Sequence, residues 1–163
     1  MRILCPLNTD EWAEASLARA VEIARSTSEL HDTMLTFLTV VPTAAQTITI
    51  TAGIASPGEL LARAGAATSV ASTAADAATE YLDTIRDRFQ SSPGDSSHLT
   101  IDLRVEAGPP AETILRIAEE IGADLIALTN RGPKGLRRST LTSINDRVIR
   151  SSGRPVLIVT VNP

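Results

Sequence analysis

The segment from Asp124 to Val161 constrains the fold of this 163-residue chain more than any other. An apolar run, 124–129, leads into a basic loop that contains Gly132, and a helical pattern and a second apolar run, 155–161, follow. Strand, glycine-bearing loop and helix start, in that order, form phosphate sites in α/β proteins, because amide N–H groups and the helix dipole both favour an anion. The segment therefore predicts a parallel sheet with an anion site at one strand end.

Strand and helix patterns alternate along the whole chain. Apolar or alternating runs predict strands at 2–8, 33–41, 98–106, 124–129 and 155–161. Apolar residues at helical spacing predict four helices: from the N-cap Asp10 to Ser28, from about 58 to 90 with an interruption near Gly65, from Pro109 to Gly122, and from a cap at Thr142 or Ser143 onward. This order predicts a doubly wound α/β sandwich with five parallel strands, in a single domain over 1–163.

Residues 42–58 fit this alternation least well. The segment is rich in Thr, Ala and Gly, and Ile48 and Ile50 alternate with threonines. We expect a short extra strand or a flexible loop, and the pattern leaves both open. The run 33–58 has no charged residue, but its prolines and threonines argue against a membrane span.

Composition and charge exclude several classes of function. The net charge of −4 argues against general nucleic-acid binding, which needs a positive field. Cys5, the only cysteine, lies in the apolar run 3–7 and is expected to be a buried thiol. The N-terminus does not have the pattern of a signal peptide, and these features together predict a cytoplasmic protein.

Seven of the fifteen Lys and Arg residues lie between Arg131 and Arg154, in an otherwise acidic chain. They indicate either an anion site or a solvated basic loop and helix face, and charge alone leaves both open. Neither a P-loop nor a G-x-G-x-x-G motif is present, and no catalytic grouping is found. His31 and His98 precede strands at the opposite sheet edge, and we interpret them as exposed loop-end residues.

In a doubly wound sheet, ligands bind beyond the carboxyl ends of the strands. Three segments should meet there: Pro6 to Asn8 after the first strand, Val40 and Val41 after the second, and the loop from Thr129 to Ser143 after the fourth.

Over essentially its whole length the chain resembles the universal stress protein family. The resemblance rests on ILCPLN, LTFLTVV, EAGPPAETIL and the terminal block TNRGPKGLRR…TSINDRVIRSSGRPVLIV. It implies a Rossmann-like, adenine nucleotide alpha hydrolase-like sheet of strand order 3-2-1-4-5. It also implies a homodimer in which the strand from Val156 to Val161 pairs across a two-fold axis.

Many members of that family bind ATP through a G-x-x-G-x9-G-[ST] signature, which this chain keeps in part. Gly132 and Ser143 match it, whereas Thr129 and Thr142 stand where glycines belong. Asn8 stands where ATP-binding members of the family have an aspartate that contacts the ribose or the metal. Val40 matches a valine that packs on adenine in those members. The resemblance implies the following set of site residues: Pro6, Asn8, Val40, Leu128, Thr129, Arg131, Gly132, Thr142, Ser143 and Ile144.

Each departure from the signature has a physical meaning. Threonine adds a branched side chain where the backbone should approach the ligand closely. The neutral Asn8 amide can still bond to a ribose but loses the charge that helps to hold Mg²⁺. We therefore expect weakened binding of ATP, with Mg²⁺ if it binds.

Two hypotheses follow. The first is a nucleotide-binding regulatory module; the second is a nucleotide-free stress-response dimer that acts on an unknown protein partner. An enzyme is not expected, because no residue is suited by type and position to act as a general base, although the sequence leaves weak ATP hydrolysis open.

Overall fold

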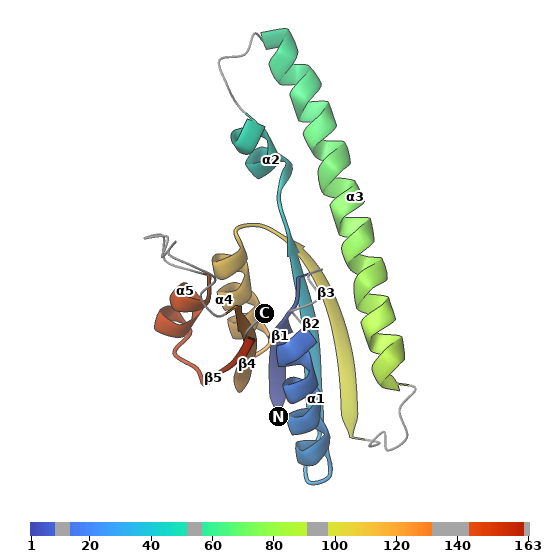
Figure 1. Ribbon diagram of the computed structural model, residues 1–163, viewed down its shortest axis with the longest axis vertical. Helices are drawn as coiled ribbons and strands as arrows, with labels where there is room; N and C mark the ends of the chain where they lie inside the picture. Colours follow the sequence, from blue (N-terminus) through green and yellow to red (C-terminus); the bar gives the residue numbers. More distant parts are fainter. Residues whose placement is uncertain (9–13, 52–56, 91–97, 132–143, 162–163) are drawn as a thin grey trace.

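A five-stranded parallel sheet forms the centre of the protein (Figure 1). The computed structural model describes residues 1–8, 14–51, 57–90, 98–131 and 144–161. The strands are β1 (Arg2–Pro6), β2 (Thr33–Val41), β3 (Leu99–Ala107), β4 (Leu125–Arg131) and β5 (Val156–Val161). Their order is β3-β2-β1-β4-β5 and every neighbouring pair is parallel, which confirms the predicted doubly wound topology.

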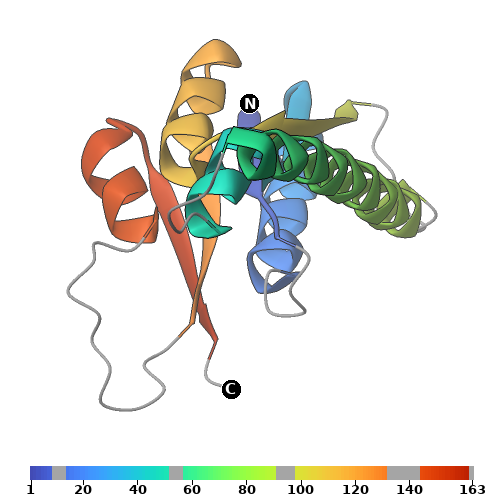
Figure 2. The same ribbon diagram turned by 90° about the horizontal axis from the view of Figure 1, so that it is seen from above.

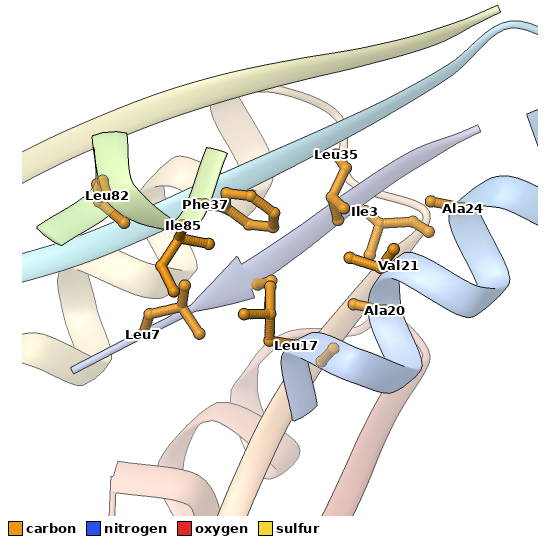
Figure 3. Packing of buried hydrophobic residues seen from close by; sticks show 12 residues of the cluster. Ile3, Leu7, Leu17, Ala20, Val21, Ala24, Leu35, Phe37, Leu82 and Ile85 are labelled. Atoms are coloured by element: carbon orange, nitrogen blue, oxygen red, sulfur yellow. The ribbon is translucent and has the colours of Figure 1, made fainter. Parts of the chain in front are cut away.

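Helices cover both faces of the sheet (Figure 2). The helices α1 (Glu14–Ser28) and α3 (Pro57–Gln90) pack on one face, and α4 (Pro110–Glu120) and α5 (Ile144–Ser151) pack on the other. One hydrophobic core cluster on the first face contains Leu17 and Val21 of α1, Ile85 of α3 and Phe37 of β2; Phe37 lies beside Ile85, and Val21 lies beside Ile3 (Figure 3). Among the described residues, Phe37 is the largest fully buried side chain, and its neighbours in the core are mostly aliphatic.

The segment between β2 and α3 corrects the sequence prediction. Residues 44–51 form a helix, α2 (Ala44–Thr51), where a short strand or a flexible loop was expected for 42–58. The helix starts with a capping box. The backbone N–H of Gln46 donates to Thr43 Oγ1 at 3.2 Å, and the backbone N–H of Thr43 donates to Gln46 Oε1 at 2.7 Å. The sequence prediction rested on the alternation of Ile and Thr and did not use the T-x-x-Q pattern that encodes this box.

The helix α3 is continuous through Gly65, so the interruption predicted there was wrong. A Cβ at Gly65 would have no neighbour within 4 Å, so the residue serves no packing need. The carboxyl half packs on the sheet through Ala78, Leu82 and Ile85, which are almost fully buried. The amino half extends past the sheet, with α2 beside it (Figure 1), and Leu61 there is 78% exposed.

Two strand boundaries differ from the prediction by two residues. β1 ends at Pro6, whereas β4 continues to Arg131 because Asn130 and Arg131 still pair with β5. The proposed cap Asp10 and the caps Thr142 and Ser143 lie outside the described residues. Within the described ranges, no helix is long and apolar enough to cross a membrane.

Candidate functional site

The strand order changes direction at β1, which has β2 on one side and β4 on the other. The carboxyl ends of β1 and β4 therefore flank the position where doubly wound sheets bind ligands, here called the switch-point site. Pro6 ends β1 opposite Leu38 of β2, and the Leu7 amide extends the pairing by donating to the Leu38 carbonyl at 2.7 Å. The first strands thus bring Pro6 and Asn8 level with the end of β2.

The predicted residues at this end differ in how accessible they are. Asn8 is exposed and Val40 is half-buried against the core cluster of Leu4 and Leu38, so both can be reached from the strand ends. Leu128 is only 3% exposed and belongs to that cluster. Leu128 therefore packs in the core beneath the strand ends and is not itself accessible to a ligand.

Thr129 forms hydrogen bonds to two different helices. Its hydroxyl accepts a hydrogen bond from the backbone N–H of Ser16, the third residue of α1, at 3.0 Å. Its carbonyl oxygen accepts another from Nδ2 of Asn145, the second residue of α5, at 3.0 Å. Thr129 is therefore bonded to the first turns of helices on both faces of the sheet.

Sequence reasoning missed both partners of Thr129. Ser16 lies 113 residues away along the chain, so no local pattern links the two. Asn145 follows Ile144, a predicted site residue whose side chain is 47% exposed. The predicted residues Gly132, Thr142 and Ser143 lie outside the described residues, and Arg131 is described only as the last residue of β4.

Two arginines of the basic window are engaged within the protein. Arg147 forms an ion pair with Glu112 of α4 at 2.7 Å. Arg154 donates to the Ala123 carbonyl, just beyond the end of α4, at 2.6 Å. The first contact joins α5 to α4, and the second joins the segment before β5 to the segment after α4, so these two cations are engaged away from the switch-point site.

Cys5 and the histidines match their predicted roles. Cys5 is fully buried, and this burial raises the pKa of its thiol to about 12, against a smaller lowering effect from Ser16. His31 is exposed, and so is His98, whose Nδ1 lies 2.8 Å from Asp32 Oδ1 at the amino ends of the strands.

The amino ends of the strands carry an open hollow of about 510 Å³, lined by residues that include Arg2, Asp32 and Asp124. It lies at the sheet edge opposite the switch-point site. The Asp124 carboxylate accepts from the Arg2 amide at 2.7 Å, so part of this lining is engaged within the fold. Among the residues that the structure describes, no cluster of His, Cys, Asp or Glu could hold a metal ion.

Fold and strand order define a doubly wound α/β protein whose strand order reverses at β1, between β2 and β4. The profile of the universal stress protein family matches residues 1–160. The chain belongs to the universal stress protein family.

Two relatives in Methanocaldococcus jannaschii share part of the sequence. The universal stress protein MJ0577 is 38% identical over 55 residues, which are 34% of each chain. The universal stress protein MJ0531 is 44% identical over 52 residues, or 32% of this chain and 31% of the relative. The matched part thus spans about a third of the length of each relative.

Solved structures share the fold over nearly the whole chain. Universal stress protein UspA from Lactobacillus plantarum has a TM-score of 0.72 and 21% identity, and the match covers 98% of this chain and 97% of that one. A universal stress protein in complex with cAMP has a TM-score of 0.64 and 21% identity, covering 98% and 96%. A family protein from Arabidopsis thaliana with AMP bound has a TM-score of 0.51 and 12% identity, covering 99% and 92%.

Proposed function

We propose that this protein is a regulatory universal stress protein, a single domain over 1–163, whose switch-point site binds adenine nucleotides weakly. The observation that carries the proposal is the placement of Asn8 and Val40 at the strand ends beside the end of β4, in a chain that belongs to this family. Two structures with the same fold contain cAMP or AMP, which supports the adenine nucleotide as the ligand class.

The described residues fit the base and the ribose better than the metal. Val40 offers a half-buried apolar surface for an adenine ring, and the exposed Asn8 amide can bond to ribose hydroxyls. Asn8 brings no negative charge for Mg²⁺, so any bound metal would depend mainly on the phosphates. The loop with Gly132, Thr142 and Ser143 would supply the phosphate contacts.

A thermal-shift titration with ATP and Mg²⁺ tests this proposal. At a ligand concentration ten times Kd, binding adds about 1.4 kcal/mol to the free energy of unfolding, or about 3 to 6 °C for a chain of this size. We expect that shift at millimolar ATP, and its loss in Gly132→Val. Leu61→Ala, on the exposed amino half of α3, is the control and should keep the shift. The absence of any shift at 10 mM ATP would contradict nucleotide binding.

We further propose a homodimer through β5. The Ile126 amide donates to the Pro155 carbonyl, and in a parallel ladder this leaves the N–H groups of Val156, Ile158 and Thr160 directed to the open edge. The strand is apolar apart from Thr160 and half-buried along most of its length. Such an edge pairs readily with a second strand.

A specific observation favours a second candidate, a nucleotide-free dimer that acts by contact with another protein. Thr129 already bonds to protein groups on α1 and α5 at the position where the family signature has a glycine. An unchanged melting temperature in the ATP titration, with an intact dimer, would select this candidate. Neither candidate includes a catalytic step, and both place the protein in the cytoplasm.

A further inference from the structure

We propose that Thr129 is a positioning residue: its hydrogen bonds brace the switch-point site with protein contacts, and the bulk of its side chain gives the site a low affinity for nucleotides. The second part rests on the proposed nucleotide function; the first does not. The brace consists of the two hydrogen bonds from Ser16 and Asn145 to one residue at the end of β4.

The first bond acts on the start of α1. Amides in the first turn of a helix need acceptors from outside the regular helix ladder, which a side chain, a water or a ligand can supply. The Thr129 hydroxyl is such an acceptor for the Ser16 amide, and it comes from the sheet rather than from a residue before the helix. Ser16 is fully buried, so loss of this acceptor would leave the amide poorly compensated by water.

The second bond acts on the start of α5. The Asn145 amide group reaches the Thr129 carbonyl, so the connection from β4 to α5 is closed by a contact between the end of the strand and the first turn of the helix. α1 contacts the core on one face and Val148 of α5 contacts the core on the other. One residue therefore fixes both helix starts relative to β4 without a ligand.

The side chain of Thr129 has two separable effects. Its hydroxyl makes the bond to α1, whereas its bulk occupies space that a glycine would leave open to a close-lying ligand. Thr129→Val removes the hydroxyl and keeps the bulk, Thr129→Ser keeps the hydroxyl, and Thr129→Gly removes both. Thr39→Val is the matched control, because the buried Thr39 hydroxyl on β2 has no hydrogen-bond partner among the described residues.

Amide hydrogen exchange, followed by NMR, tests the brace. Exchange of the Ser16 amide should be about five- to tenfold faster in Thr129→Val and Thr129→Gly, the range expected for the loss of one hydrogen bond. Thr129→Ser and Thr39→Val should leave it unchanged. An unchanged Ser16 exchange rate in Thr129→Val would overturn the brace.

Calorimetric titration with ATP and Mg²⁺ tests the effect on affinity. Thr129→Gly should bind ATP about tenfold more tightly than Thr129→Val, which keeps the bulk of the wild-type residue. Equal affinities would overturn the role in specificity, and Thr129→Ala replaces the glycine variant if that variant does not fold. If no form binds ATP, the proposed nucleotide function and the role in specificity both fail, and the exchange rates still decide the brace.

Discussion

The fold changes the chemistry of Cys5. It is the last residue but one of β1, with no exposed surface, and burial is the main cause of its raised pKa. The thiol has the Ser16 hydroxyl 3.9 Å away, a contact too weak to offset the lost hydration. Because the thiolate is the reactive form, the folded protein keeps Cys5 inert.

The pH dependence of stability should report this thiol. Below pH 9.0, the ordinary pKa of a cysteine side chain, the thiol is protonated in both the folded and the unfolded state; between 9 and about 12 only the unfolded state loses the proton. The free energy of unfolding should therefore fall by up to about 1.4 kcal/mol per pH unit in that window. Urea titrations at several pH values between 8 and 10.5 give the free energy of unfolding at each pH. This free energy should fall less steeply with pH in Cys5→Ala than in the wild type. An equal pH dependence in the two proteins would show that the Cys5 thiol does not cause the loss of stability.

At the residue scale, the sequence predicted which positions lie at the carboxyl ends of the strands but not what they bond to. Asn8 follows β1 and Val40 lies near the end of β2, and both strands have clear patterns, so the place of these residues at the carboxyl edge could be inferred from topology alone. The contact of Thr129 with Ser16 depends on how α1 is set against β4. No local periodicity encodes that contact.

The helix α3 shows how an element tolerates a poor residue. Gly65 lies in the exposed half of a continuous helix, with space around it for a side chain. Gly65→Ala should raise the free energy of unfolding by about 0.5–1 kcal/mol, because alanine loses less conformational freedom in a helix. Thermal unfolding should show this as a gain of about 1 to 4 °C.

Gly122 is the matched control for that prediction. It follows α4 with φ +61°, a left-handed conformation, and a Cβ there would lie 3.1 Å from an Arg2 guanidinium nitrogen. Gly122→Ala should therefore lower the melting temperature. A gain in both variants would show that helix propensity does not explain the effect at Gly65.

At the element scale, the strands could be predicted better than the helix starts. The run 33–41 matches β2 at both ends, because a buried parallel strand gives a continuous apolar pattern. α2 was missed because Thr and Ile favour strands by propensity, whereas the capping box between Thr43 and Gln46 and the contacts with α3 favour a helix. Tertiary contact and capping together outweighed propensity.

The two edges of the whole sheet differ in chemistry. Charged residues occupy every second position of β3, at Asp102, Arg104 and Glu106, and so lie on one face of the sheet. Arg104 pairs with Asp102 and with Glu120 of α4, and Glu106 pairs with Arg116 of α4, which also pairs with Glu120. Arg104 is the main cause of the lowered pKa of the Glu120 carboxyl, so this link weakens only as the pH falls below the usual range of a glutamate. Charges of this kind guard an edge against strand addition. β5 has no charged residue and is the edge that we expect to pair.

A charge in the middle of β5 should separate the proposed dimer. Val159 is half-buried and lies outside the two core clusters, so the folded chain can accept Val159→Glu. Two copies paired near a two-fold axis would bring the carboxylates close together, which is unfavourable. Light scattering should give twice the chain mass of 17.2 kDa for the wild type and for Val159→Thr, and the single mass for Val159→Glu. A wild-type monomer, or a Val159→Glu dimer, would contradict pairing through β5.

The overhang of α3 affects how the molecule moves through solution. At about 1.5 Å per residue its 34 residues extend about 51 Å, whereas a compact chain of 163 residues has a radius of gyration of about 15 Å. A helix that projects beyond the sheet increases hydrodynamic friction without adding mass. The protein should therefore elute early in gel filtration and sediment slowly, and a monomer judged by elution volume alone would be mistaken for a larger particle.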